Sequence, residues 1–538
     1  MLNFNGMIIV NNIKLPIDAS SKEAFSVAKK RLSSAGISCR DLHFTVYRRS
    51  IDARIKSNIF FVWSIAASGE FSQLDEKRLA AKDISVLSEN AFPKVVFGEE
   101  KLSAPPIVVG SGPCGLFAAL LLAENGYRPV LIERGGSVKE RQAAVSDFIR
   151  SHVLSEETNI QFGAGGAGTF SDGKLVTRVN DPLTNYVLGR FVEFGAPEEI
   201  KYIAKPHVGT DVLSEVVEKI LDRISQLGGK ILYHTKYISS NFKSDKVVSV
   251  NTDRGEIPAG AIILAIGHSA RDTYSGLIAS DFAVEAKNFS VGMRIEHLAE
   301  DIDRAMYGDF AGDPRLGHAE YNLSHNTKIR GVYTFCMCPG GQVVAAASES
   351  GGVVVNGMSY HARDGKNSNS AVVSTVFKED YGSTPQKAIE FQCNIERSAF
   401  LAGGGEYRAP MITVGDFLSG TLKNEPKRVL PTYMNGENLK LASPDKFLPS
   451  FVTSSIKDAL LSFDRKIHGF AVQDAVLTGA ETRTSAPVRI LRDPETRLAL
   501  GKSNFYPAGE GAGYAGGITS AAIDGLKTAI TLMNKFKH

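Results

Sequence analysis

The chain has 538 residues, enough to bury a sizeable core and to form roughly two to four domains. Its 61 Lys and Arg residues almost balance its 58 Asp and Glu residues, and a net charge of +3 favours a small substrate over nucleic acid as a partner. The five cysteines are odd in number and lack zinc-ligand spacing, so we expect no metal site and a reducing, cytoplasmic compartment. No apolar run approaches the ~18 residues of a membrane span, so a soluble protein without a membrane partner is expected.

Residues 1–100 precede the first nucleotide-binding pattern and are expected to form a unit of their own. Short apolar runs and one capping box predict the order βαββαβ, which is typical of a ferredoxin-like sandwich. The strands are expected at residues 7–10, 42–47, 59–65 and 94–97, and the helices after Ser20 and near residues 76–81. A proline-containing linker at residues 103–106 follows.

Four basic residues lie between the middle strands of this unit, Arg48, Arg49, Arg54 and Lys56. They could contact a phosphate-bearing partner or form a solvated face. We favour the solvated face, because the aromatic signature of RNA-binding domains is absent.

Residues 107–120 read as a buried strand, a glycine turn and a helix. Gly110 permits the tight turn, Gly112 lets the backbone approach a pyrophosphate, and Gly115 lets the helix pack closely on the strand. The helix N-terminus offers free N–H groups and positive dipole charge to an anion. The expected cofactor contacts of this cradle are Gly110, Gly112, Pro113, Cys114 and Gly115.

A second strand at residues 129–132 ends in Glu133 and Arg134, about twenty residues beyond the glycines. At this place a carboxylate can accept hydrogen bonds from both hydroxyls of an adenosine ribose, and it selects against a 2′-phosphate. Together with the cradle, Glu133 predicts the ADP half of a dinucleotide, with Arg134 as a further cofactor contact.

Residues 163–174 contain five glycines in twelve residues. Such a loop exposes successive backbone N–H groups, which suits a flat, anionic or multiply hydrogen-bonding ligand. A flexible surface loop is the alternative, but it would be richer in Ser and Asn. The expected cofactor contacts are Gly165, Gly166, Thr169, Ser171, Gly173 and Lys174.

Two later segments complete the nucleotide-binding pattern. A strand near residue 231 and a β-meander precede a buried strand that ends at Gly267 against the cofactor. Near the C-terminus a strand leads to Gly509 and Glu510, and a helix begins near Gly517. That helix, flanked by Gly516 and Ile518, is expected to direct its positive end at the pyrimidine edge of a flavin.

Residues 281–470 are the least nucleotide-like part and are expected to form an inserted substrate domain. His297 could be a general base, because imidazole titrates near neutrality, or a structural histidine. Cys336 and Cys338 could be a catalytic redox pair, or small core residues, since a disulfide between cysteines this close is strained.

Taken together, these motifs resemble the uncharacterised FAD-dependent dehydrogenases of bacteria, also called NAD/FAD-utilising dehydrogenases. The resemblance covers roughly residues 100–538, and its most specific parts are residues 163–175, 335–341, 481–490 and 508–525. It implies an α/β fold with a glutathione-reductase-type Rossmann FAD-binding domain and an inserted α+β substrate domain. The expected boundaries are 1–100 for the ferredoxin-like unit, 104–280 and 471–538 for the FAD-binding domain, and 281–470 for the substrate domain.

The expected function is an FAD-dependent oxidoreductase that passes a hydride between a small organic substrate and flavin N5. A flavin-dependent monooxygenase or alkene reductase of the same superfamily is the alternative. An FAD-containing RNA-modification or binding protein is an alternative of another class. Residues 281–470 contain no second strand–GxGxxG–helix unit, so NAD(P)H is expected at most as a transient electron donor.

Overall fold

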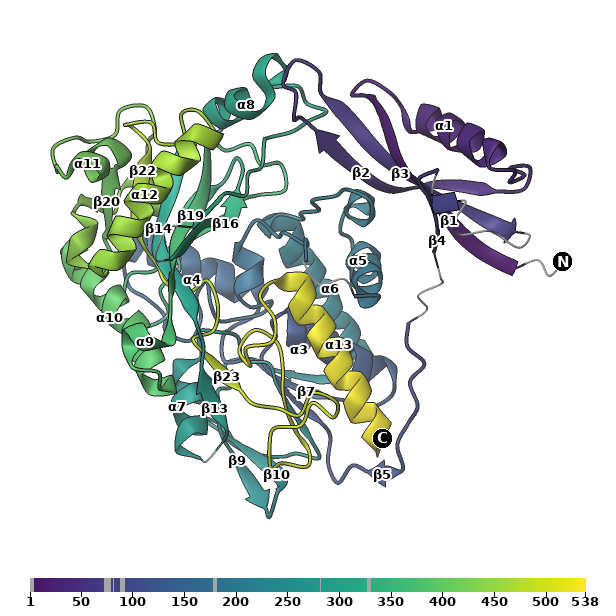
Figure 1. The fold of residues 1–538 in the computed structure, drawn as a ribbon. Helices are drawn as coiled ribbons and strands as arrows, with labels where there is room; N and C mark the ends of the chain where they lie inside the picture. The colour runs from purple at the N-terminus through teal and green to yellow at the C-terminus, as the bar shows by residue number, and fades with distance from the viewer. Residues whose placement is uncertain are drawn as a thin grey trace.

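The computed structural model describes residues 4–71, 79–80, 82–87, 92–177, 181–280, 282–326 and 330–538. The described residues contain three larger β-sheets, of four, five and seven strands. Figure 1 shows the four-stranded N-terminal sheet set apart from a main body that holds the other two. Within the described ranges, no helix has both the length and the apolarity needed to cross a bilayer.

The N-terminal sheet is antiparallel, with the strand order β2-β3-β1-β4. Its elements are β1 (Phe4–Pro16), α1 (Ser21–Ser34), β2 (His43–Asp52), β3 (Phe60–Phe71) and β4 (Ile84–Leu87). Helix α1 begins at the expected capping box, in which Ser20 and Glu23 each accept a hydrogen bond from the other's backbone N–H. Its apolar face of Ala24, Ala28 and Leu32 is buried in the core beneath the sheet.

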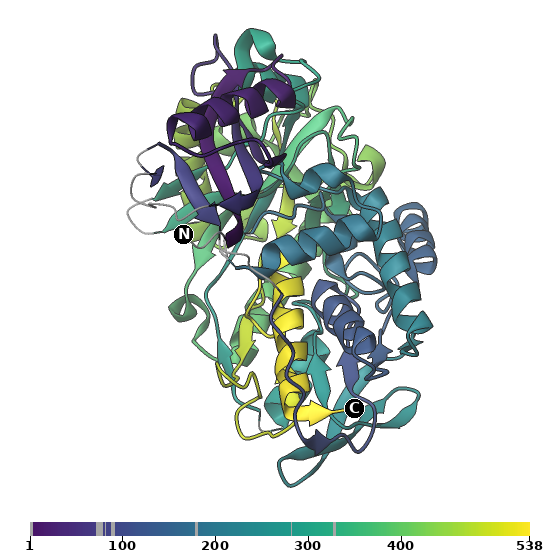
Figure 2. The ribbon, with the colours of Figure 1, turned by 90° about the vertical axis from the view of Figure 1, so that its right-hand side faces the viewer.

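The structure differs from the prediction at one element of this unit, and another predicted element lies mostly outside the described residues. The prediction of a strand at residues 94–97 is wrong. This segment instead runs alongside helix α13 (Ile518–Lys535), where the Gly98 N–H donates to the Met533 carbonyl at 2.9 Å. Figure 2 shows the segment descending beside α13. The fourth strand is β4 instead, in which buried Ile84 pairs with Val10 of β1. Most of the second expected helix, at residues 76–81, lies outside the described residues.

The outer edge of β2 attaches the N-terminal sheet to the main body. The Arg49 N–H donates to the Tyr202 carbonyl at 2.7 Å, and the Ala204 N–H donates to the Arg49 carbonyl at 2.9 Å. These two hydrogen bonds continue the strand pairing across the junction and cover an edge that would otherwise be free.

The cradle lies in a five-stranded parallel sheet of order β24-β12-β6-β7-β8. Its strands are β6 (Ile107–Val109), β7 (Val130–Ile132), β8 (Lys230–Leu232), β12 (Ile262–Leu264) and β24 (Phe505–Pro507). The expected meander is β9 (Tyr237–Lys243), β10 (Lys246–Thr252) and β11 (Gly255–Pro258). The helices of this part are α3 (Pro113–Glu124), α4 (Val138–Ser151), α5 (Leu183–Glu193), α6 (Thr210–Gln226), α7 (Arg271–Ala279) and α13. Helix α3 is apolar and buried over nearly its whole length, because it packs against both α13 and α6.

The seven-stranded sheet has the order β15-β16-β19-β14-β22-β20-β21. Its strands are β14 (Phe289–Leu298), β15 (Ser324–Asn326), β16 (Gly331–Cys338), β19 (Asn367–Val376), β20 (Ala409–Thr413), β21 (Leu439–Leu441) and β22 (Val476–Glu481). The helices of this part are α8 (Ala299–Tyr307), α9 (Lys378–Tyr381), α10 (Pro385–Gly403), α11 (Val414–Ser419) and α12 (Ser450–Lys466). Since β22 pairs with β14 inside this sheet, the expected end of the inserted segment at residue 470 is too early.

The described residues also contain three two-stranded ribbons. They are β13 (Val284–Ala286) with β23 (Val488–Ile490), β17 (Gln342–Ala345) with β18 (Val355–Met358), and β5 (Glu100–Lys101) with β25 (Phe536–Lys537). Short 3-10 turns lie at Ala167–Phe170, Glu198–Lys201, Gly308–Phe310, Tyr433–Gly436 and Pro444–Lys446. The chain passes twice between the parallel sheet and the seven-stranded sheet, and the β13–β23 ribbon lies at both points, since β13 precedes β14 and β23 follows β22.

Candidate cofactor and active site

A cavity of about 1360 Å³ lies between the parallel sheet and the seven-stranded sheet. It exceeds the roughly 300–1,000 Å³ of an ordinary ligand pocket, so it can hold a large cofactor together with a second molecule. One wall, here called the cofactor wall, consists of the loops that follow β6, β7, β12 and β24 together with the loop at residues 163–174. The other, the substrate wall, consists of residues of β16, β18 and β22 and the segment before β15.

The glycine cradle is packed so tightly that side chains are excluded. Gly110 has φ +96°, and a Cβ there would lie 2.4 Å from the Ala265 carbonyl oxygen. A Cβ on Gly115 would lie 1.8 Å from the Gly110 carbonyl oxygen. Helix α3 begins with Gly112 as its N-cap and without a side-chain cap, and Gly112, Pro113 and Cys114 line the cavity. The positive end of α3 therefore faces the space where an anion would bind.

Glu133 lines the cofactor wall but already accepts four hydrogen bonds. Its carboxylate receives the Ser111 N–H at 3.0 Å, the Ser111 hydroxyl at 2.6 Å, the Gly135 N–H at 2.9 Å and the Gly163 N–H at 3.0 Å. Glu133 thus ties three turns together, a role beyond the expected ribose contact. Arg134 beside it pairs with Glu157 at 2.7 Å and Asp272 at 3.0 Å.

The second glycine loop packs directly on the cradle, and a Cβ on Gly166 would lie 2.9 Å from the Gly112 Cα. Of the expected contacts in this loop, Gly166, Ser171 and Lys174 line the cavity. Gly165, Thr169 and Gly173 do not line it. Gly165 and Gly173 have positive φ and are tightly packed, Gly165 against the Thr169 and Val217 side chains and Gly173 against the Gly209 backbone. The buried Thr169 hydroxyl donates to the Gly166 carbonyl at 2.9 Å.

The centre of this loop is held by a buried arginine that sequence reasoning missed. Arg141 of α4 is 1% exposed, and its guanidinium donates to the carbonyls of Asn159, Ile160, Ala164 and Gly166 at 2.5–2.9 Å. Burial lowers the pKa of Arg141 to about 9. A single Arg in an amphipathic helix carries no signal that marks such a role.

The loops after β12 and β24 meet on the other side of α3. Gly267 has φ +71° and no atom within 4 Å of a would-be Cβ, so the space beside it belongs to the cavity. His268, which the sequence did not single out, has its Nδ1 3.6 Å from Glu510 Oε1. Its buried Nε2 has no hydrogen-bond partner among the described residues. Such an orphaned polar atom in a cavity wall fits a site that a cofactor completes.

The C-terminal helix also meets its expectation in part. Gly516, Gly517 and Ile518 line the cavity, and α13 begins at Ile518 with Gly517 as its N-cap. Gly509 and Gly115 instead serve packing, since a Cβ on Gly509 would lie 2.8 Å from the Cys114 Cβ. A bound dinucleotide fits three features of this wall together. They are the open space beside Gly267 and Gly516, the turns that only glycine can occupy, and the unpartnered Nε2 of His268.

The substrate wall rests on a buried ion pair. Arg294 of β14 is 0% exposed and binds both carboxylate oxygens of Glu481 at 2.9 Å. It also donates to Asn369 Oδ1 at 2.7 Å, Asn356 Oδ1 at 3.1 Å and the Cys336 carbonyl at 3.1 Å. Burial lowers the pKa of Arg294, but the charge and hydrogen bonds of Glu481, together with the two nearby cysteines, outweigh burial and raise it. Glu481, Asn356 and Cys336 line the cavity, so Arg294 fixes their positions from behind.

A second buried ion cluster supports the same wall. Glu396 accepts from Arg271 at 2.7 Å and from Arg483 at 3.0 Å. Burial alone would raise the pKa of Glu396, but these two arginines lower it well below its ordinary value. Both guanidinium groups are used within the protein, and they offer the cavity little charge for a substrate carboxylate.

The expected catalytic residues separate in the structure. His297 is 1% exposed, lies outside the residues that line the cavity, and has its Nε2 2.7 Å from the Phe470 carbonyl. Burial lowers its pKa to about 4. These features favour the structural alternative, in which His297 is a neutral core residue of β14. Cys336 lines the cavity, whereas Cys338 is fully buried behind it.

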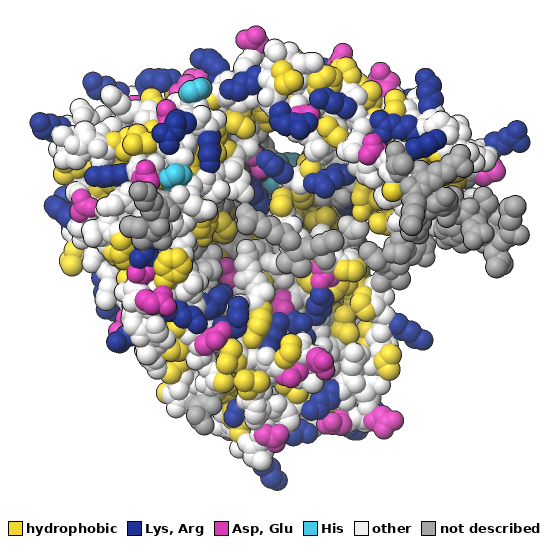
Figure 3. Space-filling model, viewed as in Figure 1, with side chains coloured by type: hydrophobic (Ala, Val, Ile, Leu, Met, Phe, Trp, Pro, Cys, Tyr) yellow, Lys and Arg dark blue, Asp and Glu magenta, His cyan; other side chains and the backbone are white. Residues whose placement is uncertain are grey.

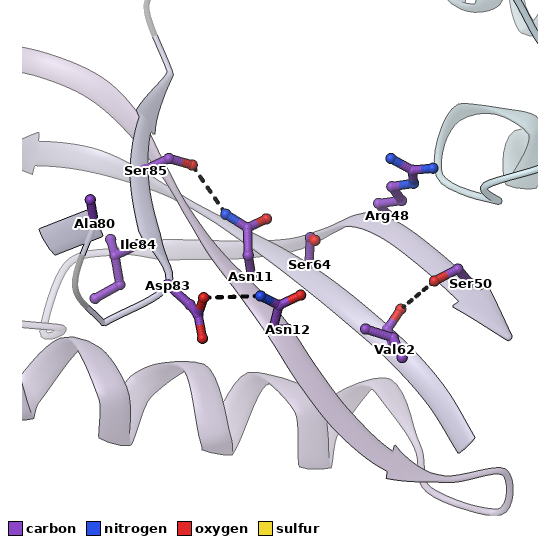
Figure 4. A pocket seen from close by; sticks show the side chains of 10 residues that line it. All are labelled: Asn11, Asn12, Arg48, Ser50, Val62, Ser64, Ala80, Asp83, Ile84 and Ser85. Carbon is purple, nitrogen blue, oxygen red and sulfur yellow. Dashed lines mark hydrogen bonds between the residues drawn. The ribbon is translucent and has the colours of Figure 1, made fainter. Parts of the chain in front are cut away.

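A shallow hollow of about 490 Å³ lies on the N-terminal sheet, lined mainly by small polar side chains (Figure 4). Asn12 donates to Asp83 at 2.9 Å, and the Arg48 side chain points away from the sheet. Arg49 stacks over the rings of Phe61 and Trp63. In Figure 3 the molecule is hollowed between this sheet and the main body, and Lys and Arg side chains rim the hollow.

Three family models match the chain. They are "FAD-dependent protein, C-terminal domain-like" at residues 288–484, "Pyridine nucleotide-disulphide oxidoreductase" at residues 105–304, and a domain of unknown function, DUF8436, at residues 7–68. The first covers the substrate wall, and the second covers the part of the cofactor wall that precedes β24. The fold and the cavity therefore define an FAD-dependent oxidoreductase.

An uncharacterized protein of Clostridium beijerinckii is 43% identical over 534 residues, which are 98% of this chain and 99% of that protein. The chain belongs to the uncharacterised FAD-dependent family that includes this protein. Among solved structures, glycine oxidase from Bacillus cereus is 10% identical and covers 81% of this chain and 99% of its own, with a TM-score of 0.36. CtdE in complex with FAD is 12% identical and covers 80% of this chain and 84% of its own, with a TM-score of 0.33. Likeness at this level carries no argument about substrate or activity.

Proposed function

We propose that the protein is a dehydrogenase that transfers a hydride between a small organic substrate and N5 of FAD. The observation that carries this proposal is one cavity with two unlike walls. The cofactor wall offers glycine turns and two helix N-termini, α3 and α13, to a dinucleotide. The substrate wall offers Tyr333, Phe335 and Cys336 between buried ion pairs. FAD supplies the exchange of the electron pair, and the residues of the chain bind it, orient it and exclude water.

We assign the cofactor to the residues that line the cofactor wall. They are Gly110, Gly112, Pro113, Cys114, Glu133, Arg134, Gly166, Ser171, Lys174, Gly267, His268, Glu510, Gly516, Gly517 and Ile518. NAD(P)H, if it acts, binds transiently in the same cavity, since the sequence holds no second GxGxxG unit of the required context. Nucleic acid is not a partner in this proposal, because Arg49 is stacked on aromatic rings and Arg54 pairs with Asp52 at 2.8 Å.

The finer architecture belongs to the same proposal. We interpret the N-terminal sheet as a ferredoxin-like unit and the parallel sheet as a glutathione-reductase-type FAD-binding domain. The seven-stranded sheet, with its end moved beyond β22, is the inserted substrate domain. A cytoplasmic location agrees with the few cysteines of the chain.

Release and reduction of the cofactor test the function. Heat should release FAD, and anaerobic addition of NADH, NADPH or a panel of small alcohols, amines and hydroxy acids should bleach the flavin absorbance. Rapid oxygen consumption coupled to substrate hydroxylation would instead identify a monooxygenase, and oxidation of the reduced flavin by an enone would identify an alkene reductase. Recovery of FMN alone would refute the cofactor assignment.

Two glycine substitutions test where FAD binds. Gly115→Ala places a methyl group 1.8 Å from the Gly110 carbonyl oxygen, so the cradle must move and FAD retention should fall sharply. Gly189→Ala in helix α5 is the matched control, because its Cβ meets no atom within 4 Å and Gly189 does not line the cavity. Equal FAD retention in both variants would place the cofactor elsewhere.

A further inference from the structure

A β-bulge in β16 directs Cys336 into the cavity. The pairing of β16 with β19 shifts register between Phe335 and Cys338. Cys336 has φ +45°, in the left-handed region that residues with a Cβ seldom adopt. Backbone strain of this kind persists where the surroundings enforce it, and it gathers at functional sites.

Three donors from different parts of the chain hold the bulge. Arg294 donates to the Cys336 carbonyl at 3.1 Å, and the Cys338 thiol donates to the same oxygen at 3.4 Å. The Lys174 ammonium donates to the neighbouring Met337 carbonyl. Lys174 belongs to the cofactor wall, so the bulge is fixed from both walls and its position is set by the assembled cavity.

The charges around Cys336 favour its ionised form. The neighbouring Cys338 thiol is the largest influence on the pKa of the Cys336 thiol, and burial opposes it. Arg294 and Lys174 add positive charge, while Asp172 opposes them from the glycine loop, where it is paired with Arg363. The sum lowers the pKa of Cys336 to about 7, and the same contact raises the pKa of Cys338.

We propose that Cys336 is a nucleophilic site whose thiolate bonds to a soft electrophilic carbon of a small ligand, in particular the β-carbon of an unsaturated carbonyl compound. The sulfur donates an electron pair to this carbon, the electrons of the C=C bond move to the α-carbon, and the α-carbon takes a proton from water. No oxidant or reductant is consumed, so this activity goes beyond the proposed hydride transfer. Cys338 is a positioning residue, because it is fully buried and acts through Cys336.

Alkylation of the FAD-bound full chain with N-ethylmaleimide tests the proposal. The reagent is an unsaturated carbonyl compound, and its adduct is located by peptide mass at several pH values between 5.5 and 9. We expect Cys336 to be modified with half-maximal rate near pH 7. At pH 7 its rate should be roughly three times that of an ordinary thiol of pKa ~8.5, since the larger ionised fraction outweighs the lower nucleophilicity of a more acidic thiolate. Cys39, a partly buried cysteine of the N-terminal unit, is the internal reference.

Two substitutions at Cys338 separate positioning from packing. Cys338→Ala removes the donor and should move the half-maximal pH of Cys336 modification upward, whereas Cys338→Ser keeps a donor and should move it less. Cys336→Ser should abolish the fast adduct, and Cys393→Ser should leave it in place. Flavin absorbance reports that each variant is folded and loaded. The proposal is overturned if Cys336 stays unmodified in the FAD-bound protein, if its half-maximal pH reaches about 8.5, or if Cys338→Ala leaves that pH unchanged.

Discussion

The two walls of the cavity are built in different ways. The cofactor wall consists largely of backbone, and the closest approach in its cradle joins Gly110 and Gly115, which are near each other in the sequence. The substrate wall consists of side chains held by partners distant in the sequence, since Arg294 reaches Glu481 across 187 positions and Asn369 across 75. A backbone cradle can recognise a cofactor that many proteins share, whereas a side-chain network can be altered one residue at a time. The difference indicates that single substitutions can alter the substrate wall more readily than the cofactor wall.

The largest effect is expected from breaking the ion pair of the substrate wall. Arg294→Met leaves the Glu481 carboxylate buried without its partner, and loss of one member of a buried pair costs about 3–5 kcal/mol. The free energy of unfolding, measured by urea denaturation, should fall by that amount. The double variant Arg294→Met with Glu481→Leu leaves no charge unpaired and should recover much of the loss. Equal destabilisation of the single and double variants would contradict this account of the wall.

The pH dependence of stability tests His297 in the same sheet. The native imidazole stays neutral down to about pH 4, whereas the unfolded chain binds a proton from about pH 6.5. The free energy of unfolding should therefore fall as the pH falls from 6.5 to 4, by up to about 3 kcal/mol from this residue. His297→Gln should flatten this dependence and leave the flavin spectrum unchanged. Part of the slope should remain, because burial also lowers the pKa of His207 to about 4. A large loss of the flavin reduction rate in His297→Gln would instead support a catalytic role for this histidine.

On the cofactor wall, Glu133 should matter to both fold and FAD affinity. Glu133→Gln replaces a carboxylate that accepts four hydrogen bonds with an amide that cannot accept at both ends. Hydrogen bonds to a charged group contribute about 1.5–3 kcal/mol, and unfolding free energy and FAD retention should fall together. Ser111→Ala, which removes one donor of the four, is the milder control. If stability falls while FAD retention does not, Glu133 serves only as a clamp of the turns.

The smallest effect is expected from the capping box at the start of α4. Hydrogen bonds from Ser137 and His234 lower the pKa of Glu140 to about 2 in the capping box. Its contribution to stability is present above about pH 4.5 and is lost as the pH falls towards 2. The side chain is 55% exposed, so solvent screening limits the contribution to below about 1 kcal/mol. Glu140→Gln should narrow the difference between thermal midpoints at pH 6 and pH 3, and an unchanged difference would argue against the capping contribution.

The sequence by itself determined the parts whose geometry is local. The turn at Gly110, the start of α3, the strand that ends at Glu133 and the start of α13 near Gly517 each depend on residues within a few positions of one another. Backbone conformation and hydrogen-bonded turns are set over such distances, so spacing alone predicts them. The capping box at Ser20 was recognisable for the same reason.

Only the tertiary structure decided which side chains meet. The fourth N-terminal strand is β4 and not residues 94–97, because α13, more than 400 positions later, supplies the hydrogen bond to Gly98. His297 belongs to the core because the sheet places its side chain inside. Cys336 belongs to the cavity because the bulge in β16 directs it there. Arg141 and Arg294 carry no local signal, since a buried charge is stabilised by partners that folding brings from elsewhere. Contacts of this kind depend on the packing of whole sheets, and no spacing rule along the chain encodes them.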